Sequence, residues 1–176
     1  VAGFAAPASV AGVTFTTATI GGQAAQVAAL TRGTFLRLTH GFAPNGGGLQ
    51  VNQYTLIMDL NFPERPAGYA ALYQSNPENA NDAEWFIHPS GGLGISQIYG
   101  GSVPNNAWNR LAVVVDHTNG TFTSFMIGSQ VQQSSTTALD DRWALLPELL
   151  LFADEDQENA PVLVNSVQLR PVAMTP

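Results

Sequence analysis

The residues best suited to chemistry are carboxylates that lie close together in a turn-forming stretch. Asp154, Asp156 and Glu158 alternate along a run of acidic and amide residues. In an irregular loop, oxygen ligands at alternating positions can converge on one hard cation such as Ca²⁺. The run is not an EF-hand, because Asn159 stands where Gly is required and Asn165 where Glu is required. The stretch therefore predicts either a calcium site or a solvated acidic turn.

A second polar segment, Asn79-Ala80-Asn81-Asp82, precedes Trp85. Asn and Asp in loops often form turns through hydrogen bonds to their own backbone. A carboxylate beside an exposed aromatic plane would instead suit a sugar, whose hydroxyl groups donate hydrogen bonds to the carboxylate while its ring stacks on the aromatic face. The segment predicts a turn or, through Asp82 and Trp85, a sugar site.

Asp59 and Asn61 lie within a stretch that otherwise has strand character. Asp is depleted in strand interiors, so the face that carries Asp59 is either wet or holds a partner for the carboxylate. Arg110 is a candidate partner. We expect Asp59 either to form a structural pair with Arg110 or to line a ligand groove together with Asn61.

Short β-strands are the elements that must position these side chains. Alternation of apolar and polar residues is typical of a half-buried strand, and in 54–62 it points Tyr54, Leu56, Met58, Leu60 and Phe62 to the core. Segment 23–30 is compatible with a short helix, an edge strand or a loop, and 140–147 favours a short helical turn. Strands are predicted at 13–20, 34–40, 54–62, 69–74, 84–88, 93–99, 111–115, 121–127, 130–134, 149–152 and 162–169.

The segment 108–128 predicts a β-hairpin, because Asn119-Gly120 separates two apolar, β-branched runs. A two-residue loop would place Val113 opposite Met126. A three-residue loop with a bulge at Gly120 would shift that register. Eleven to thirteen short strands without a long helix indicate an all-β fold, a two-sheet antiparallel β-sandwich of the jelly-roll type. One domain over 1–176 is expected, with 1–12 as a segment that leads into it.

Composition excludes several classes of partner. The formal net charge is −7 and the sequence contains no Lys, which argues against nucleic acid and anionic membrane surfaces, since both are bound mainly by cationic groups. The absence of Cys excludes disulfides and thiolate metal sites. No apolar run approaches the ~20 residues of a membrane span. Low charge with abundant Thr, Ser, Asn and Gln favours a secreted or cell-surface chain, and the start of the sequence resembles a cut piece or a mature N-terminus.

Four stretches resemble the concanavalin A-like lectin/glucanase superfamily, in particular the laminin-G-like domains of bacterial secreted proteins. They are Tyr54–Pro63, Trp108–Asp116, Phe125–Gly128 and the pair 151–156 and 164–169. The resemblance implies two curved antiparallel sheets, often with a carbohydrate or Ca²⁺ site. The chain departs from that pattern at Ile127-Gly128, where the family has Asp or Asn before Gly, so a different type of turn is expected there.

The resemblance also bears on catalysis. Glucanases of this superfamily carry Glu-x-Asp on one strand, and no Glu of this chain has Asp two residues later. A Gly-x-Ser-x-Gly elbow is missing, and the three His residues are too far apart for a helical zinc motif. We therefore expect no enzyme but a carbohydrate-binding module of a larger secreted protein, assisted by Ca²⁺ or not. The alternatives are a structural or protein-interaction module that binds neighbouring domains, and an accessory domain of a secreted hydrolase.

Overall fold

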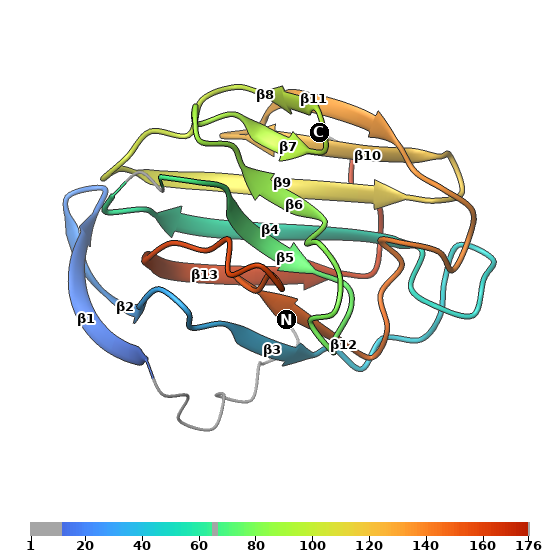
Figure 1. The fold of residues 1–176 in the computed structure, drawn as a ribbon, viewed down its shortest axis with the longest axis horizontal. Coiled ribbons are helices and arrows are strands. Elements are labelled where there is room, and N and C mark those ends of the chain that lie inside the picture. Colours follow the sequence, from blue (N-terminus) through green and yellow to red (C-terminus); the bar gives the residue numbers. More distant parts are fainter. Residues whose placement is uncertain (1–11, 65–66, 176) are drawn as a thin grey trace.

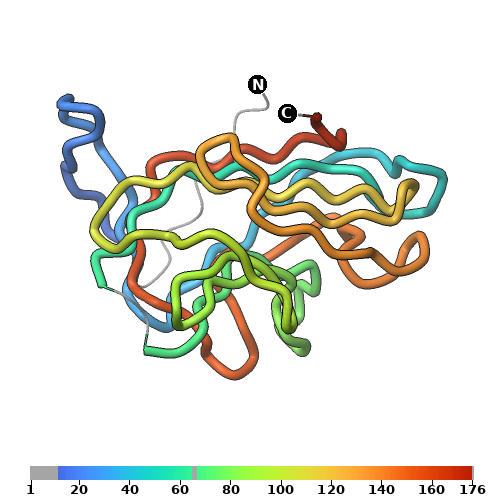
Figure 2. Tube along the Cα trace, turned by 90° about the horizontal axis from the view of Figure 1, so that it is seen from above, coloured from blue at the N-terminus to red at the C-terminus, as the bar shows by residue number. Residues whose placement is uncertain are grey.

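The computed structural model describes residues 12–64 and 67–175. The predicted lead-in segment 1–12 lies outside the described residues, apart from Gly12. Two antiparallel β-sheets pack face to face (Figures 1 and 2), and the described part of the chain contains no helix. The prediction of an all-β, two-sheet sandwich is confirmed. No helix that could cross a membrane occurs within the described ranges.

The larger sheet has seven strands, joined throughout by antiparallel pairing. β4 and β9 lie at its centre, and their residues pair continuously over nine positions. In spatial order the strands are β1 (Val13–Ile20), β2 (Gln23–Leu30), β13 (Val162–Arg170), β4 (Gln53–Asn61), β9 (Trp108–Asp116), β10 (Thr121–Met126) and β11 (Ser129–Ser135).

The smaller sheet has six strands and faces the viewer in Figure 1. Its strands are shorter than those of the larger sheet. In spatial order they are β3 (Leu36–Thr39), β12 (Glu148–Leu151), β5 (Ala70–Gln74), β6 (Trp85–Ile87), β7 (Leu93–Ile95) and β8 (Ile98–Gly100).

The core lies between the two sheets. The predicted inward side chains of β4 are buried, with Leu56, Met58 and Leu60 fully enclosed, because successive side chains of a strand point to opposite faces. A polar pair crosses the core: the hydroxyl groups of Tyr54 and Tyr73 are 2.9 Å apart, and Tyr54 also donates to the carbonyl of Trp143 at 2.6 Å. These bonds tie both sheets to the loop that precedes β12.

The edges of the two sheets meet where β8 lies against β11. A Cβ atom added at Gly100 would stand 1.7 Å from the carbonyl oxygen of Val131. Only glycine permits so close an approach of two backbones. The sandwich is therefore closed along this side by direct backbone contact.

Three segments differ from the sequence-based expectations or resolve them. The ambiguous segment 23–30 is strand β2, paired with β1 across Gly21-Gly22. The single strand predicted over 93–99 is two strands, since Ser96 has a φ of 55° and reverses the chain. The helical turn predicted at 140–147 is wrong, because Asp140 and Trp143 have φ values of 60° and 81°, outside the right-handed helical region.

The hairpin at 108–128 is confirmed, but the two-residue register is wrong. Thr121 pairs with Asp116, and Val113 pairs with Ser124 rather than Met126. The loop therefore has four residues. The cause is the side chain of Asp116, which accepts hydrogen bonds from the backbone and side-chain nitrogens of Asn119 at 3.1 and 2.7 Å and thereby folds a wider turn.

The turn between β10 and β11 contains an unusual residue. Ile127 and Gly128 have φ values of 50° and 79°, which matches a two-residue turn of type I′. Asn or Asp would adopt the first position more easily than a β-branched side chain. The expected difference in turn type is therefore not found. The strained residue is Ile127, and its side chain is 69% exposed.

Candidate functional site

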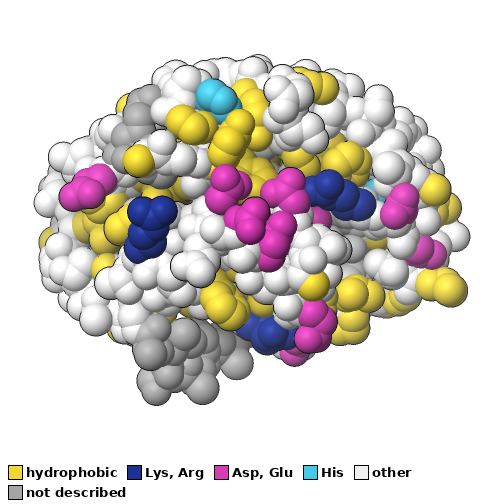
Figure 3. Space-filling model, viewed as in Figure 1, with side chains coloured by type: hydrophobic (Ala, Val, Ile, Leu, Met, Phe, Trp, Pro, Cys, Tyr) yellow, Lys and Arg dark blue, Asp and Glu magenta, His cyan; other side chains and the backbone are white. Residues whose placement is uncertain are grey.

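A polar pocket of about 490 Å³ opens on the outer side of the six-stranded sheet. Three loops form it: the segment between β5 and β6, the segment before β12 and the segment between β12 and β13. Acidic side chains gather at the centre of this side of the molecule (Figure 3). The side chains that line the pocket include Ser75, Asn81, Asp82, Asp141, Arg142 and Glu155.

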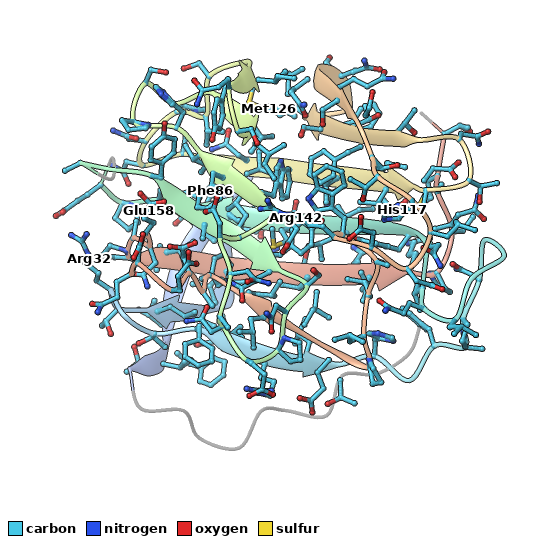
Figure 4. The ribbon with its side chains drawn as sticks, turned by 45° about the vertical axis from the view of Figure 1, so that its right-hand side comes forward. Arg32, Phe86, His117, Met126, Arg142 and Glu158 are labelled. Carbon is cyan, nitrogen blue, oxygen red and sulfur yellow. The ribbon has the colours of Figure 1, made fainter. Side chains whose placement is uncertain are left out.

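Hydrogen bonds between the loops hold the pocket in shape. Arg142, labelled in Figure 4, donates to the carbonyl oxygens of Asp82 and Ala83 at 3.2 and 3.0 Å. The carboxylate of Asp154 accepts the backbone N–H groups of Ala83 and Asp156, both at 3.0 Å. Gln74 donates to the carbonyl of Asn81 at 2.6 Å. Each of the three loops is thus bonded to another loop or to β5.

Glu84 forms the buried wall of the pocket, and its residue surface is only 2% exposed. One carboxylate oxygen, Oε2, accepts the backbone N–H of Ser75. The other, Oε1, lies 3.6 Å from Nε of Arg142, which is an ion-pair distance but too long for a hydrogen bond. Burial raises the pKa of Glu84 to about 7, against the lowering effects of Ser75 and Arg142. Oε1 is therefore paired with Arg142 by charge rather than by a hydrogen bond, and it belongs to the lining of the pocket.

Three carboxylates converge at the mouth of the pocket. Oxygen atoms of Asp82, Asp154 and Glu155 lie within 4.8 Å of one another. Burial and the neighbouring negative charges raise the pKa values of Asp82 and Glu155. Carboxylate oxygens are the ligands that Ca²⁺ prefers, so the chemistry of this donor set fits a calcium ion. The set differs from the predicted one, because Asp82 and Glu155 take the places expected for Asp156 and Glu158.

An aromatic cluster borders these carboxylates on the same sheet face. The ring of Tyr69 lies 5.9 Å from Phe86 and 6.0 Å from Tyr99, and the rings of His88 and Tyr99 are 5.0 Å apart. Burial raises the pKa of Tyr99 to about 12, with smaller contributions from Tyr69, Asp82 and Glu158. The hydroxyl of Tyr99 therefore feels the field of the acidic loops.

The structure places the remaining predicted residues elsewhere. Trp85 has no exposed surface, and its indole N–H donates to Ser124 at 2.9 Å inside the core. The expected stacking of a sugar on Trp85 is therefore wrong, because β6 turns this side chain inward. The side chain of Glu158 does not belong to the group of three carboxylates. Its backbone carbonyl accepts a hydrogen bond from the N–H of Ala71 at 2.7 Å. Asp156 is exposed at the rim.

Asp59 and Asn61 belong to β4 of the other sheet. Arg110 binds both carboxylate oxygens of Asp59, each at 2.8 Å, and Ser166 donates to Oδ2 at 2.8 Å. The expected pairing with Arg110 is confirmed. Asn61 is 7% exposed, and its side-chain oxygen has no partner among the described residues. Neither residue lines the pocket described above.

Five residues of the pocket were not anticipated from the sequence: Ser75, Glu84, Asp141, Arg142 and Glu155. Glu84 carried a weak signal, since a carboxylate directly before the apolar run Trp-Phe-Ile must either begin the strand or become buried with it. Arg142 sits in the segment that was interpreted as a helical turn. Its role depends on contacts with a loop sixty residues away in sequence, which no local pattern reveals.

Comparison with known protein families and with curated proteins found no match. Solved structures share the fold. Domain 4 of AbnA, a GH43 extracellular arabinanase from Geobacillus stearothermophilus, in complex with arabinotriose, has a TM-score of 0.60 and 18% identity, over 93% of this chain and 77% of that one. The binding domain of Paraclostridial Mosquitocidal Protein 1 has a TM-score of 0.61 and 12% identity, over 94% of this chain and 44% of that one. The receptor binding domain of botulinum neurotoxin type G has a TM-score of 0.58 and 9% identity, over 94% of this chain and 42% of that one.

These similarities establish the architecture. The chain shares its β-sandwich with domains whose names describe carbohydrate or receptor binding, at identities below one fifth. It spans most of the arabinanase domain and less than half of either toxin domain. Function has to be argued from the site, because one fold serves many activities.

Proposed function

We propose that this chain is a non-catalytic glycan-binding module and that the pocket at Glu84 is its binding site. The observation that carries the proposal is the lining of the pocket: amide, hydroxyl and carboxylate groups from three mutually bonded loops face an open space of about 490 Å³. Sugar hydroxyl groups both donate and accept, and they are recognised by a few fixed polar groups of this kind. The arabinotriose complex of the similarly folded arabinanase domain supports the same class of ligand.

Kinship with the concanavalin A-like and laminin-G-like domains is part of this proposal, as is a secreted or cell-surface location next to other domains. The two-sheet architecture supports the kinship. The proposal that the chain is not an enzyme is supported by the sequence, in which no Glu is followed by Asp two residues later and no Gly-x-Ser-x-Gly elbow occurs.

The binding test is a glycan array followed by calorimetry with each oligosaccharide that binds. The variant Asp82→Ala removes an exposed lining carboxylate, and Asp59→Asn on the other sheet serves as the control. We expect Asp82→Ala to weaken binding about ten-fold or more, since a hydrogen bond to a charged group contributes roughly 1.5–3 kcal/mol. Binding that is lost only in Asp59→Asn would move the site to β4. No binding to any glycan, together with tight binding to a neighbouring domain, would favour an interaction module.

Calcium assistance is a separate part of the proposal. The convergence of Asp82, Asp154 and Glu155 supports it, and Asp82 and Glu155 are exposed at the mouth of the pocket where an ion could enter. If Ca²⁺ binds at these carboxylates, saturating calcium at about 100 times the dissociation constant would stabilise the fold by about 2.7 kcal/mol. Glu155→Ala would abolish the rise in Tm and Asp156→Ala would retain it. The reverse pattern would assign the ion to the alternating set of the acidic loop, and a flat titration to millimolar calcium would refute the site.

A further inference from the structure

The pocket at Glu84 contains far more negative than positive charge. Among the described residues, the cation that lines it is Arg142. That guanidinium is occupied: its terminal nitrogen donates to two carbonyl groups, and its Nε lies near Glu84. Carboxylates in or next to the pocket are Asp82, Glu84, Asp141, Asp154, Glu155, Asp156 and Glu158. Even one divalent ion at the mouth would leave this excess uncompensated.

The buried end of the pocket has an acceptor that is paired by charge rather than by a hydrogen bond. Glu84 is more than nine-tenths buried, and Oε1 lines the pocket with Arg142 as its neighbour at 3.6 Å. A ligand that supplies a charged N–H donor to Oε1 would form a charge-assisted hydrogen bond there, and such bonds are about twice as strong as neutral ones.

The acceptors at the mouth are spaced for such a donor. A protonated primary amine carries three N–H donors. The oxygen atoms of Asp82, Asp154 and Glu155 lie within 4.8 Å of one another, so one ammonium group can reach more than one of them. Beside them lie the half-buried rings of Tyr69 and Tyr99, whose centroids are 6.0 Å apart. Acidic and aromatic groups therefore adjoin on one sheet face.

From this arrangement we infer that the pocket selects glycans that carry free amino groups, with a protonated amine bound between Glu84 Oε1 and the carboxylates at the mouth. The inference rests on the proposed glycan-binding function and names the class of sugar that the site recognises. A neutral or N-acetylated sugar can donate to Oε1 only through an uncharged hydroxyl or amide group, which forms a weaker hydrogen bond with a carboxylate.

The test uses matched pairs of oligosaccharides, oligomers of glucosamine and of N-acetylglucosamine of equal length, titrated calorimetrically in EDTA and again in calcium. We expect the amino form to bind about ten- to hundred-fold more tightly, the factor that one charge-assisted hydrogen bond supplies. Its affinity should fall with added salt, while that of the N-acetylated form should not. Glu84→Gln, which keeps the size of the side chain, should abolish the preference, and Asp59→Asn should retain it.

Two further measurements keep the result open to refutation. Asp82→Asn and Asp141→Asn change exposed side chains, so they test the charge of the pocket even if Glu84→Gln fails to fold. Each should reduce the preference for the glucosamine oligomer over the N-acetylglucosamine oligomer about three- to ten-fold. Equal affinity for both oligomers would overturn the inference and leave the glycan-binding function intact. Binding of an oligolysine peptide as tight as that of the amino sugar would also overturn it, because the site would then attract any cation. Absence of binding to every glycan would refute both.

Discussion

The buried carboxyl group of Glu84 makes the stability of this fold depend on pH in an unusual direction. Its pKa is about 7 in the folded protein, against an ordinary value near 4.5. The folded state therefore retains a proton that the unfolded chain has already released between these two values. The contribution of Glu84 to the free energy of unfolding is therefore greatest below about pH 4.5. This contribution is lost as the pH rises through 7.

The size of the effect follows from the pKa difference. One pKa unit corresponds to about 1.4 kcal/mol, so ionised Glu84 costs the folded protein about 3 kcal/mol at pH 8 relative to pH 4.5. Side chains that face this carboxyl group are Asp82, Asp141, Arg142, Glu155, Tyr54 and Tyr73. Glu84→Gln removes the titration and can still accept the hydrogen bond from Ser75.

Urea denaturation at a series of pH values from 4.5 to 8 measures the effect. The free energy of unfolding of Glu84→Gln minus that of the wild type should increase by about 3 kcal/mol across this range. The test depends on how the stability difference between Glu84→Gln and the wild type changes with pH, because any pH-independent effect of the Gln side chain cancels in that comparison. Glu148→Gln, at an exposed ion pair with Arg37, is the control and should show no such increase. A constant difference for Glu84→Gln between pH 4.5 and 8 would refute the reasoning.

The other predictions concern residues away from the pocket. Ile127→Asn should stabilise the fold by about 1 kcal/mol in thermal unfolding, because Asn tolerates the φ of 50°; a loss of stability would show that the turn is not strained. Tyr54→Phe should cost about 1–3 kcal/mol by leaving the Trp143 carbonyl and the Tyr73 hydroxyl without their partner, and an unchanged Tm would contradict this bond. Asp59→Asn should cost about 1 kcal/mol at pH 7. Arg110 lowers the pKa of Asp59, so that cost should shrink as the pH falls below the ordinary range of a carboxyl group and acid protonates Asp59, and a deficit that does not change with pH would contradict the ion pair.

Local side-chain patterns were sufficient to predict much of the fold. The limits of β1 and the inward side chains of β4 follow from alternation alone. Segment 23–30 could not be assigned, because Ala favours a helix and only pairing with β1 and β13 makes the segment a strand. The hairpin register depended on a side-chain bond of Asp116, which propensity does not express.

The candidate site was predicted only in parts. Asp82 and Asp154 were recognised in separate loops, but their convergence is a tertiary event between segments some seventy residues apart. Trp85 was misplaced because its direction depends on the bulge where β5 meets β6, between Ala71 and Tyr73. Patterns of polar residues thus indicate which segments bear ligand groups, while the contacts between loops decide which of those groups meet.

The tight passage of Gly100 beside Val131 has a consequence for association with other chains. Along that margin the backbone of β8 at Gly100 lies directly against the backbone of β11 at Val131, so no further strand fits between the two at this point. The opposite margin ends in β1, eight residues of Val, Thr, Phe, Ala and Ile with neither charge nor proline, and within the described residues it pairs with β2 alone. Such an edge can template the addition of a strand from another chain, and β3 is the corresponding edge of the smaller sheet.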